Sequence, residues 1–420
     1  MKKLTFITRE YNDLDHALPI IYFLKKSNKY DIKIYSIGNN LDRNNSLNKI
    51  LRDEINIKIE KFEQIYNKNF FFKLAQILKK KRETFKLSYK KTNMPLIIFI
   101  ELLNQFLNIL VILIHKKKIL SKLLNSTILA DFGTEDLFPY YSIIKLSKKY
   151  KIPIYAYAHG VNIFANLDPI RKKTSKSYLK NFILKILFFK FNPQHYDKYL
   201  VGIEQTTYFR STMYKSFNRN YLHKIYEIGI PRYTKEWIEV LDKYYYKNYN
   251  NKNLINVCLF LSNEKFNVNK TKLKKLVVEL SKLKNIKFSI KGHTRSGLTG
   301  LHKGIDKKFI IEKESNDIIL NTDIAIIYGT SITFQALQKK VPVIIPSYID
   351  NNEHIFTKYN TCFNALSQHE VIDFIENFDK QKFLIEKQKN IEKFINKIVY
   401  DNKNYDNMMK RYHDILIYEK

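Results

Sequence analysis

The chain has 420 residues, of which 45% are hydrophobic and 27% are charged, so it can bury sizeable cores and is not an intrinsically disordered protein, and its length predicts two or three domains. Ten glycines and nine prolines are few for this length, which disfavours a loop-rich all-β protein and favours long helices and strands. The net charge of +33 attracts phosphate-rich partners, but the basic residues are spread along the chain without zinc-ligand spacing or an RNA-binding signature, so nucleic acid is disfavoured.

Short apolar segments that predict strands alternate with longer helical patterns in the first half of the chain. The predicted strands are 4–8, 32–37, 128–131, 154–158, 199–202 and 225–228. The predicted helices are 16–26, 70–81, 96–115 and 140–150. This alternation is typical of a parallel sheet that is covered by helices on both faces.

One of these predicted helices lies in the apolar segment 95–115, which is long enough to be mistaken for a membrane span. Its polar residues fall at helical spacings and form one stripe: Glu101, Asn104, Gln105 and Asn108. An amphipathic helix is therefore favoured over a true span. It could be buried in the first domain, or it could rest on an anionic membrane surface, since lysines flank it on both sides.

A polar stretch without apolar periodicity, 243–253, predicts a linker, and the alternation restarts after it. The second set of predicted strands is 256–261, 287–290, 309–311, 324–327, 343–345 and 362–365. The second set of predicted helices is 270–283, 331–339 and 369–377, with a mainly helical tail over 381–417. The sequence thus predicts an α/β protein with two doubly wound, Rossmann-like parallel-sheet domains that face a cleft.

The expected boundaries are 1–240 for an acceptor-side domain and 254–400 for a nucleotide-donor domain, with a C-terminal helix in 401–420 that could pack back on the first domain. Two cysteines far apart in sequence, Cys258 and Cys362, indicate no disulfide framework and fit a reducing cytoplasm. The apolar run at the N-terminus stops at Arg9, which is too short for a signal peptide. We therefore expect a cytoplasmic protein, which could also attach peripherally to the inner face of the membrane.

The stretch 324–346 carries a strand, a turn, a helix and a second strand. Gly329 permits a tight turn and a close approach of the backbone to a ligand. Thr330, Ser331 and Thr333 are expected to cap the helix and to place hydroxyl and N–H groups at its positive end. This pattern predicts a phosphate site, and an ordinary capped turn is the alternative.

A second basic cluster follows the predicted strand 287–290. Lys291, His293 and Arg295 alternate onto one side of an extended segment. A point charge, a hydrogen-bond donor and a bidentate guanidinium suit a diphosphate. The alternative is a solvated loop in a very basic protein.

Two motifs at strand ends of the first half could supply a base. His159 and Gly160 follow the predicted strand 154–158, where a histidine could deprotonate an acceptor hydroxyl or could be structural. Asp131, Glu135 and Asp136 follow the strand 128–131, where they could act as base, orient His159 or start a helix. Arg9 ends the first strand and would face the same cleft.

Four short motifs together resemble the GT-B glycosyltransferase architecture. They are His159-Gly160, Ile228-Gly229-Ile230-Pro231-Arg232, Lys291-Gly292-His293 and Gly329-Thr330-Ser331. More narrowly, the chain is similar to bacterial surface-polymer transferases that use cytidine-activated donors, namely the CDP-glycerol glycerophosphotransferases of teichoic acid synthesis and the capsule Kdo- and sialic-acid-type transferases. The resemblance covers most of the chain in order and spacing.

The resemblance implies roles for particular residues. His159 corresponds to a candidate catalytic base, whereas an acidic residue takes that role in the sialyl and Kdo relatives, which would be Asp131, Glu135 or Asp136. The donor would be bound by the two second-half motifs: Lys291, His293, Thr330 and Ser331, together with Arg295, Gly329 and Thr333. Arg9, Gly160 and Arg232 would contact substrate.

Two departures from the family pattern leave the donor open between CMP-, CDP- and UDP-linked compounds. Gly292-His293-Thr294 stands where the relatives commonly show a Pro-His-Pro-like segment, and Gly329-Thr330-Ser331 stands where they often show a Ser-Ser pair. The sequence shows no Walker-type loop and no metal-ligand cluster. We therefore expect no metal and no cofactor, with the leaving phosphate stabilised by the basic cluster and the helix N-terminus.

The expected activity is transfer of a sugar or a glycerol-phosphate-like unit from the nucleotide-activated donor to a cell-surface polysaccharide or lipid-linked acceptor. A sugar-nucleotide epimerase or hydrolase of the same shape is the first alternative, and it would need several carboxylates around the sugar. A non-enzymatic basic protein that binds membrane or nucleic acid is the second, and it would not need the ordered motifs at strand ends.

Overall fold

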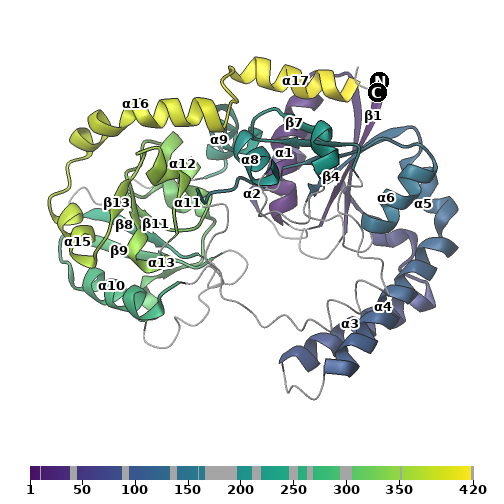
Figure 1. Ribbon diagram of the computed structural model, residues 1–420, viewed down its shortest axis with the longest axis horizontal. Coiled ribbons are helices and arrows are strands. Elements are labelled where there is room, and N and C mark those ends of the chain that lie inside the picture. The colour runs from purple at the N-terminus through teal and green to yellow at the C-terminus, as the bar shows by residue number, and fades with distance from the viewer. Residues whose placement is uncertain are drawn as a thin grey trace.

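Two parallel α/β sheets organise the chain, as the computed structural model shows (Figure 1). The residues that the structure describes are 1–9, 11–37, 45–87, 94–132, 140–158, 160–165, 196–210, 219–245, 254–262, 268–293, 305–350 and 352–417. Every strand pairing within the two sheets is parallel. The predicted fold class is confirmed.

The first sheet has seven strands in the order β3-β2-β1-β4-β5-β6-β7. Their bounds are β1 Lys2–Thr8, β2 Tyr30–Ser36, β3 Ile59–Lys61, β4 Ser126–Asp131, β5 Ile154–Tyr157, β6 Lys198–Val201 and β7 Ile225–Glu227. The strand order reverses between β1 and β4, which is the position where open α/β sheets bind ligands. Six of the seven strands match predicted ones, and the short edge strand β3 was not predicted.

The helices of the first half cover both faces of this sheet (Figure 1). Their bounds are α1 Tyr11–Lys26, α2 Ser46–Ile50, α3 Phe70–Leu87, α4 Met94–Ile114, α5 Lys116–Leu123, α6 Tyr140–Lys149, α8 Ile203–Arg210 and α9 Lys235–Asp242. Alternate residues of β1 serve the two faces: Phe6 packs in the core with α1, whereas Ile7 packs in the core with α5 and α6. Burial on both faces explains why the central parts of the strands are mostly apolar.

The second sheet has six strands in the order β10-β9-β8-β11-β12-β13, and all six match predicted strands. Their bounds are β8 Ile255–Phe260, β9 Ile286–Lys291, β10 Ile310–Ile311, β11 Ile324–Ile327, β12 Val343–Pro346 and β13 Phe363–Ala365. The helices around it are α10 Lys270–Lys282, α11 Ser315–Leu320, α12 Ile332–Gln338, α13 Ser347–Asp350, α14 Ile355–Lys358, α15 Gln368–Glu376 and α16 Lys380–Ile398. Both cysteines are buried, and burial raises the pKa of each thiol to about 12.

The last helix, α17 (Tyr405–Ile417), lies against the first domain although α16 packs on the second. Met408 and Tyr412 join the core that contains α1 and β1, and the Tyr412 hydroxyl donates to the Gly229 carbonyl at 3.3 Å. Figure 1 shows α16 and α17 in succession along the same side of both domains, with the two chain ends adjacent. The chain therefore returns to the domain in which it started.

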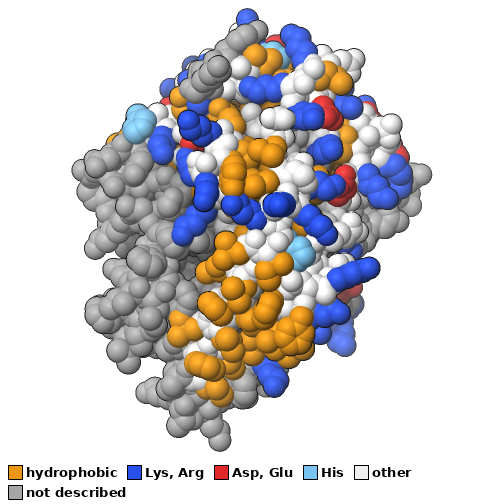
Figure 2. All heavy atoms as spheres, turned by 90° about the vertical axis from the view of Figure 1, so that its right-hand side faces the viewer, with side chains coloured by type: hydrophobic (Ala, Val, Ile, Leu, Met, Phe, Trp, Pro, Cys, Tyr) orange, Lys and Arg blue, Asp and Glu red, His pale blue; other side chains and the backbone are white. Residues whose placement is uncertain are grey.

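The long apolar helix is present as α4, paired with α3, and the two described residues of its polar stripe are buried, while Glu101 and Gln105 lie outside the described side chains. Asn104 and Asn108 are buried, whereas apolar side chains of the opposite face are exposed and gather over α3 and α4 in Figure 2. The expectation of a helix buried in the first domain thus holds for one face only. Within the described parts of the chain, no helix combines the length and the apolar character that crossing a membrane requires.

Candidate active site

The motif residues of the first half lie along one edge of the first sheet. Thr8 ends β1 and precedes Arg9, Asp131 ends β4, and Gly160 lies just beyond β5. The parallel register, with Asp131 opposite Tyr157, brings these strand ends to the same level. Predicted site residues outside the described ranges are His159 and Glu135, with Asp136 beside them and Arg295 in the second half.

Two buried carboxylates lie beneath this edge. Asp13 of α1 accepts a hydrogen bond from the Arg9 backbone at 2.9 Å and lies 3.6 Å from the Arg9 guanidinium. Asp131 is 1% exposed. Burial raises the pKa of Tyr140 and Tyr157 well above the ordinary tyrosine value, and the charges of Asp13 and Asp131 add to the shift. Both carboxylates therefore lie close to these two phenols in a poorly hydrated environment.

The segment 160–165 leaves the first sheet and pairs with the second domain. Phe164 forms an antiparallel bridge with His354, and their rings are 5.3 Å apart. The Ala165 N–H donates to the Glu353 carbonyl at 2.7 Å, and the Ile355 N–H donates to the Ile163 carbonyl at 2.9 Å. The segment 160–165, which leaves the first sheet after β5, is thus anchored to the second domain.

Tyr233 connects Gly160 with the turn of the second sheet. Gly160 has a φ of +88°, and a Cβ there would lie 3.6 Å from His16 Nε2 and 3.8 Å from the Tyr233 hydroxyl. Tyr233 forms a hydrogen bond with Ser331, and its ring stacks on Phe334 of α12 at 4.6 Å. Gly160 and the Gly-Thr-Ser motif, which are far apart in sequence, therefore lie on either side of the Tyr233 side chain.

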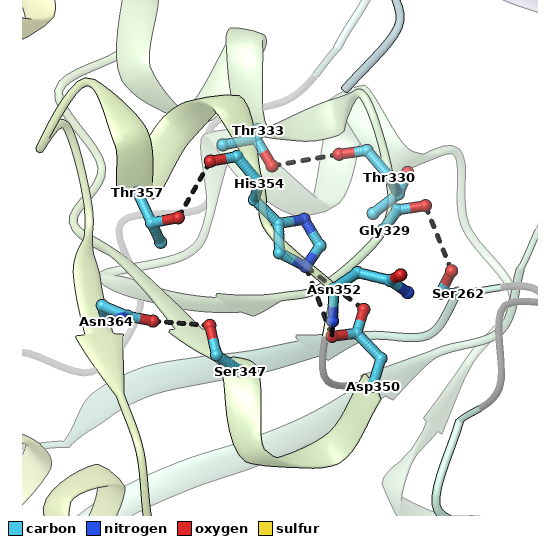
Figure 3. A network of polar contacts seen from close by, with 10 residues as sticks. All are labelled: Ser262, Gly329, Thr330, Thr333, Ser347, Asp350, Asn352, His354, Thr357 and Asn364. Carbon is cyan, nitrogen blue, oxygen red and sulfur yellow. Dashed lines mark hydrogen bonds and ion pairs between the residues drawn. The ribbon is translucent and has the colours of Figure 1, made fainter. Parts of the chain in front are cut away.

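The position of Gly329 at the end of β11 leaves no room for a side chain (Figure 3). Its φ is +60°, and a Cβ would lie 2.5 Å from Ser262 Oγ and 3.7 Å from the Phe164 ring. The Ser262 hydroxyl donates to the Gly329 carbonyl at 3.1 Å. The turn is thus closed by Ser262 of its own sheet and approached by Phe164 of the first domain.

The hydroxyls of this turn do not cap the helix in the way expected. Ser331 is the N-cap residue of α12, but its side chain makes no capping hydrogen bond and bonds Tyr233 instead. The Thr333 hydroxyl donates back to the Thr330 carbonyl at 3.0 Å. The first amides of α12 are therefore left without a side-chain cap from Ser331, which is the arrangement that an anion at a helix start would need.

Lys291 lies at the same edge of the second sheet as this turn. The register places Lys291 opposite Phe260 of β8, and Phe260 opposite Ile327 of β11. The Lys291 side chain is half-buried, and burial lowers the pKa of its ammonium group. His293 follows two residues later and is also half-buried. A solvated loop is therefore not an adequate description of this cluster.

Arg232 is engaged in the interior between the domains. Its Nε lies 2.6 Å from Asp15 Oδ1, and the two side chains are 7% and 14% exposed. Burial raises the pKa of Asp15, and the neighbouring Arg232 partly offsets that shift. A substrate contact of Arg232 remains a prediction, whereas its ion pair holds α1 against the turn Pro231–Tyr233.

A buried pair at the second domain was missed in the sequence. His354 Nε2 lies 3.1 Å from Asp350 Oδ2, both side chains are 1% exposed, and Asp350 Oδ1 accepts from the Asn352 N–H at 3.1 Å (Figure 3). Asp350 and His354 are four residues apart just after β12, and this spacing at a strand end was the available signal. No sequence pattern pointed to His16, Tyr233 or Ser262, because only the tertiary fold brings them close to the motifs.

The comparisons with known proteins bear on the fold. No family model matches the chain, and no curated protein matches its sequence. The UDP-GlcNAc 2-epimerase from Neisseria meningitidis bound to UDP-GlcNAc is 12% identical, with 99% of both chains covered and a TM-score of 0.55. The wall teichoic acid polymerase TagF with CDPG is 12% identical over 99% of this chain and 88% of its own, with a TM-score of 0.51.

A UDP complex of MnaA from S. aureus is 10% identical over 100% of this chain and 96% of its own, with a TM-score of 0.50. These matches extend over both parallel-sheet domains. The chain has the GT-B fold. The predicted resemblance is thereby confirmed for the GT-B architecture, and Gly329 and Gly160 lie at the facing strand ends of its two domains. Among the described residues, no three His, Cys, Asp or Glu side chains form a metal-binding group.

Proposed function

We propose that this GT-B protein is a glycosyltransferase-type enzyme. It transfers a sugar or a glycerol-phosphate-like unit from a CMP-, CDP- or UDP-linked donor to a cell-surface polysaccharide or a lipid-linked acceptor. It needs no metal, and it works in the cytoplasm, where a peripheral contact with the membrane would bring it to the acceptor. A relation to nucleotide-sugar enzymes is supported by neighbours whose structures contain UDP-GlcNAc, UDP or CDPG.

The observation that carries this proposal is the meeting of the two motifs at Tyr233 and Phe164. Tyr233 forms a hydrogen bond with Ser331 and lies 3.8 Å from where a Cβ of Gly160 would be, and a Cβ at Gly329 would lie 3.7 Å from the Phe164 ring. A base next to Gly160 would then stand opposite a donor held at the Gly329 turn. Such opposition suits transfer, because the acceptor hydroxyl must attack from the side away from the leaving phosphate.

The chemistry of the donor side follows from charge. The nucleotide phosphate that leaves gains negative charge in the transition state, and preorganised donors stabilise it. Lys291, His293 and Arg295 supply cationic or donor groups, and the amides at the start of α12 add to them. On the acceptor side, the deep burial of Asp131 favours His159 or Glu135 as the group that reaches the acceptor hydroxyl.

Epimerisation is the second candidate, since two of the fold neighbours are bound to UDP-GlcNAc or UDP and one is a UDP-GlcNAc 2-epimerase. It would require carboxylates directed at the sugar. Three of the described carboxylates are engaged by protein groups: Asp15 by Arg232, Glu314 by Ser46 and Tyr245, and Asp350 by His354. This engagement supports transfer over epimerisation.

Thermal shift with CMP, CDP, UDP and GDP tests the donor site. We expect one of the pyrimidine nucleotides to raise the melting temperature, with the rise reduced in Lys291→Ala. A ligand at one hundred times its Kd stabilises by about 2.7 kcal/mol, which is readily measured. If none of the four nucleotides stabilises the protein, the proposal is wrong.

Product analysis separates the two candidate activities and assigns the base. The enzyme is incubated with a sugar or glycerol derivative of the nucleotide that stabilises it. Transfer releases free nucleotide only when an acceptor is present, whereas epimerisation yields an isomer of the donor without any acceptor. His159→Ala should reduce turnover by about 100-fold or more while nucleotide binding is retained. Unchanged turnover in His159→Ala would move the role to the acidic residues, which Glu135→Gln and Asp131→Asn then distinguish.

A further inference from the structure

Helices α3 and α4 form a pair that projects from the first domain, at the lower right of Figure 1, away from the motif residues. They pack against each other along their lengths, and α5 continues from α4. Neither helix contributes a residue to the candidate active site. Their outer face therefore calls for an explanation of its own.

The outer face of α4 is apolar and its inner side contains amides. Asn104 and Asn108 are 9% and 8% exposed and bond each other, the Asn108 amide donating to Asn104 Oδ1 at 3.0 Å. Phe99, Phe106 and Leu113 are 60%, 57% and 60% exposed. These three are seven residues apart and therefore lie on one face of the helix. A helix that faces water normally shows the opposite arrangement.

Further apolar side chains extend this face. The exposed ones on the two helices are Phe70, Ile77, Leu96, Phe99, Phe106, Ile109, Leu113 and Ile114. Figure 2 shows an apolar area over α3 and α4, with Lys and Arg side chains at its margins. We call this set the α3–α4 surface. Contiguous apolar areas of this kind on a protein surface mark an interaction site rather than scattered exposure.

Lysines predominate among the described charged side chains around the α3–α4 surface. Its exposed lysines are Lys73, Lys79, Lys80 and Lys81 on α3 and Lys117 and Lys118 on α5. Glu83 of α3 and Glu101 of α4 lie outside the described side chains, and the three helices contain no other Asp or Glu. An apolar strip with cationic margins is complementary to a layer that is apolar inside and anionic at its surface.

We propose that the α3–α4 surface docks on an anionic lipid bilayer. The Phe, Leu and Ile side chains enter the boundary between headgroups and acyl chains, and the lysines contact lipid phosphates. A second copy of the chain is a poorer occupant, because two such surfaces would bring like charges together. The proposal stands independently of which donor the enzyme uses, since it rests on a different part of the molecule.

Co-sedimentation with vesicles tests this inference on the full-length protein. Wild-type protein should bind vesicles that contain phosphatidylglycerol and should bind pure phosphatidylcholine vesicles much more weakly. The triple variant Phe99→Ser, Phe106→Ser, Leu113→Ser should bind the anionic vesicles at least about 100-fold more weakly, given the apolar area that is lost. Lys73→Gln with Lys80→Gln should weaken binding by roughly tenfold and reduce its salt sensitivity.

A matched control replaces three exposed apolar residues of the second domain. Val278, Leu366 and Ile385 are 47%, 65% and 81% exposed, and Val278→Ser, Leu366→Ser, Ile385→Ser should bind vesicles like the wild type. Equal binding by the two triple variants would overturn the proposal, as would absence of wild-type binding. Sedimentation velocity tests whether the surface is instead a contact between protein chains. If the α3–α4 variant dissociates an oligomer while vesicle binding is unchanged, the surface is a protein interface and the proposal fails.

The thermal shift that nucleotides induce reports separately on the proposed function, and it should be the same in all variants.

Discussion

Gly329 and Gly160 both have positive φ values, yet their surroundings differ. A Cβ at Gly329 would overlap Ser262 Oγ at 2.5 Å, whereas at Gly160 the nearest atom would be 3.6 Å away. We expect Gly160→Ala to cost about 1 kcal/mol from backbone strain alone. Gly329→Ala should cost a further 1–3 kcal/mol, roughly, because its neighbours must move. Urea unfolding measures both.

Comparing Gly329→Ala with Gly160→Ala separates the cost of steric overlap from the cost of backbone strain. Adding Ser262→Gly to Gly329→Ala should recover part of the lost stability, since the overlapping hydroxyl is removed. Equal destabilisation by the two alanine variants would contradict the overlap at Gly329.

Lys291 should give nucleotide binding a particular pH dependence. Burial lowers the pKa of Lys291 from 10.5, and only the ammonium form attracts phosphate, so binding raises that pKa again. Affinity should therefore fall as the pH rises through the lowered pKa, and binding should take up protons there. Calorimetric titration in two buffers of different ionisation enthalpy measures this uptake.

Lys291→Arg is the control for this titration, because a guanidinium stays charged over the whole accessible range. Its affinity should change little with pH. The same steep fall in Lys291→Arg would assign the titration to another group.

At the scale of elements, the contact between the segment 160–165 and the second domain can be tested through Phe164. Phe164 is 4% exposed between His354 and the Gly329 turn. Phe164→Ala should lower the free energy of unfolding by about 3 kcal/mol, as expected for a buried aromatic ring, and should weaken nucleotide binding. Phe70→Ala, at a residue 70% exposed, is the control and should stay within about 0.5 kcal/mol. Comparable losses in both variants would contradict the role of Phe164.

The elements themselves were largely predictable, because buried parallel strands are mostly apolar and alternate with periodic helices. The exception β3 has three residues, Ile59–Lys61, and two of them are exposed and charged, so it has no apolar run. The orientation of α4 was also not predictable. Its sequence shows a polar stripe, but only packing against its neighbours determines that Asn104 and Asn108 lie inside. The roles of Tyr233, His16 and Ser262 likewise depend on contacts across large sequence separations.

At the scale of the whole molecule, Glu314 connects the two domains. Its carboxylate accepts hydrogen bonds from the hydroxyls of Tyr11, Ser46 and Tyr245 and from the Ser46 backbone N–H, all from the first domain. Glu314→Ala should cost about 2 kcal/mol, since bonds to a charged acceptor are strong. It should also split thermal unfolding into two calorimetric transitions.

Glu312→Ala makes the same charge change at an exposed position two residues away. It should leave a single transition and an unchanged melting temperature. Two transitions in both variants would show that charge, and not the Glu314 hydrogen bonds, couples the domains.

The return of α17 to the first domain has a mechanical consequence. The chain passes between the domains twice, after Tyr245 and again at Tyr400, where the Tyr400 hydroxyl donates to Glu236. These two passages lie at opposite ends of α9, a helix of eight residues and about 12 Å. Both passages of the chain between the domains therefore lie beside the same helix, where a hinge could form. Opening should therefore proceed as a swing about an axis along α9, once the Phe164–His354 and Glu314 contacts between the domains are released.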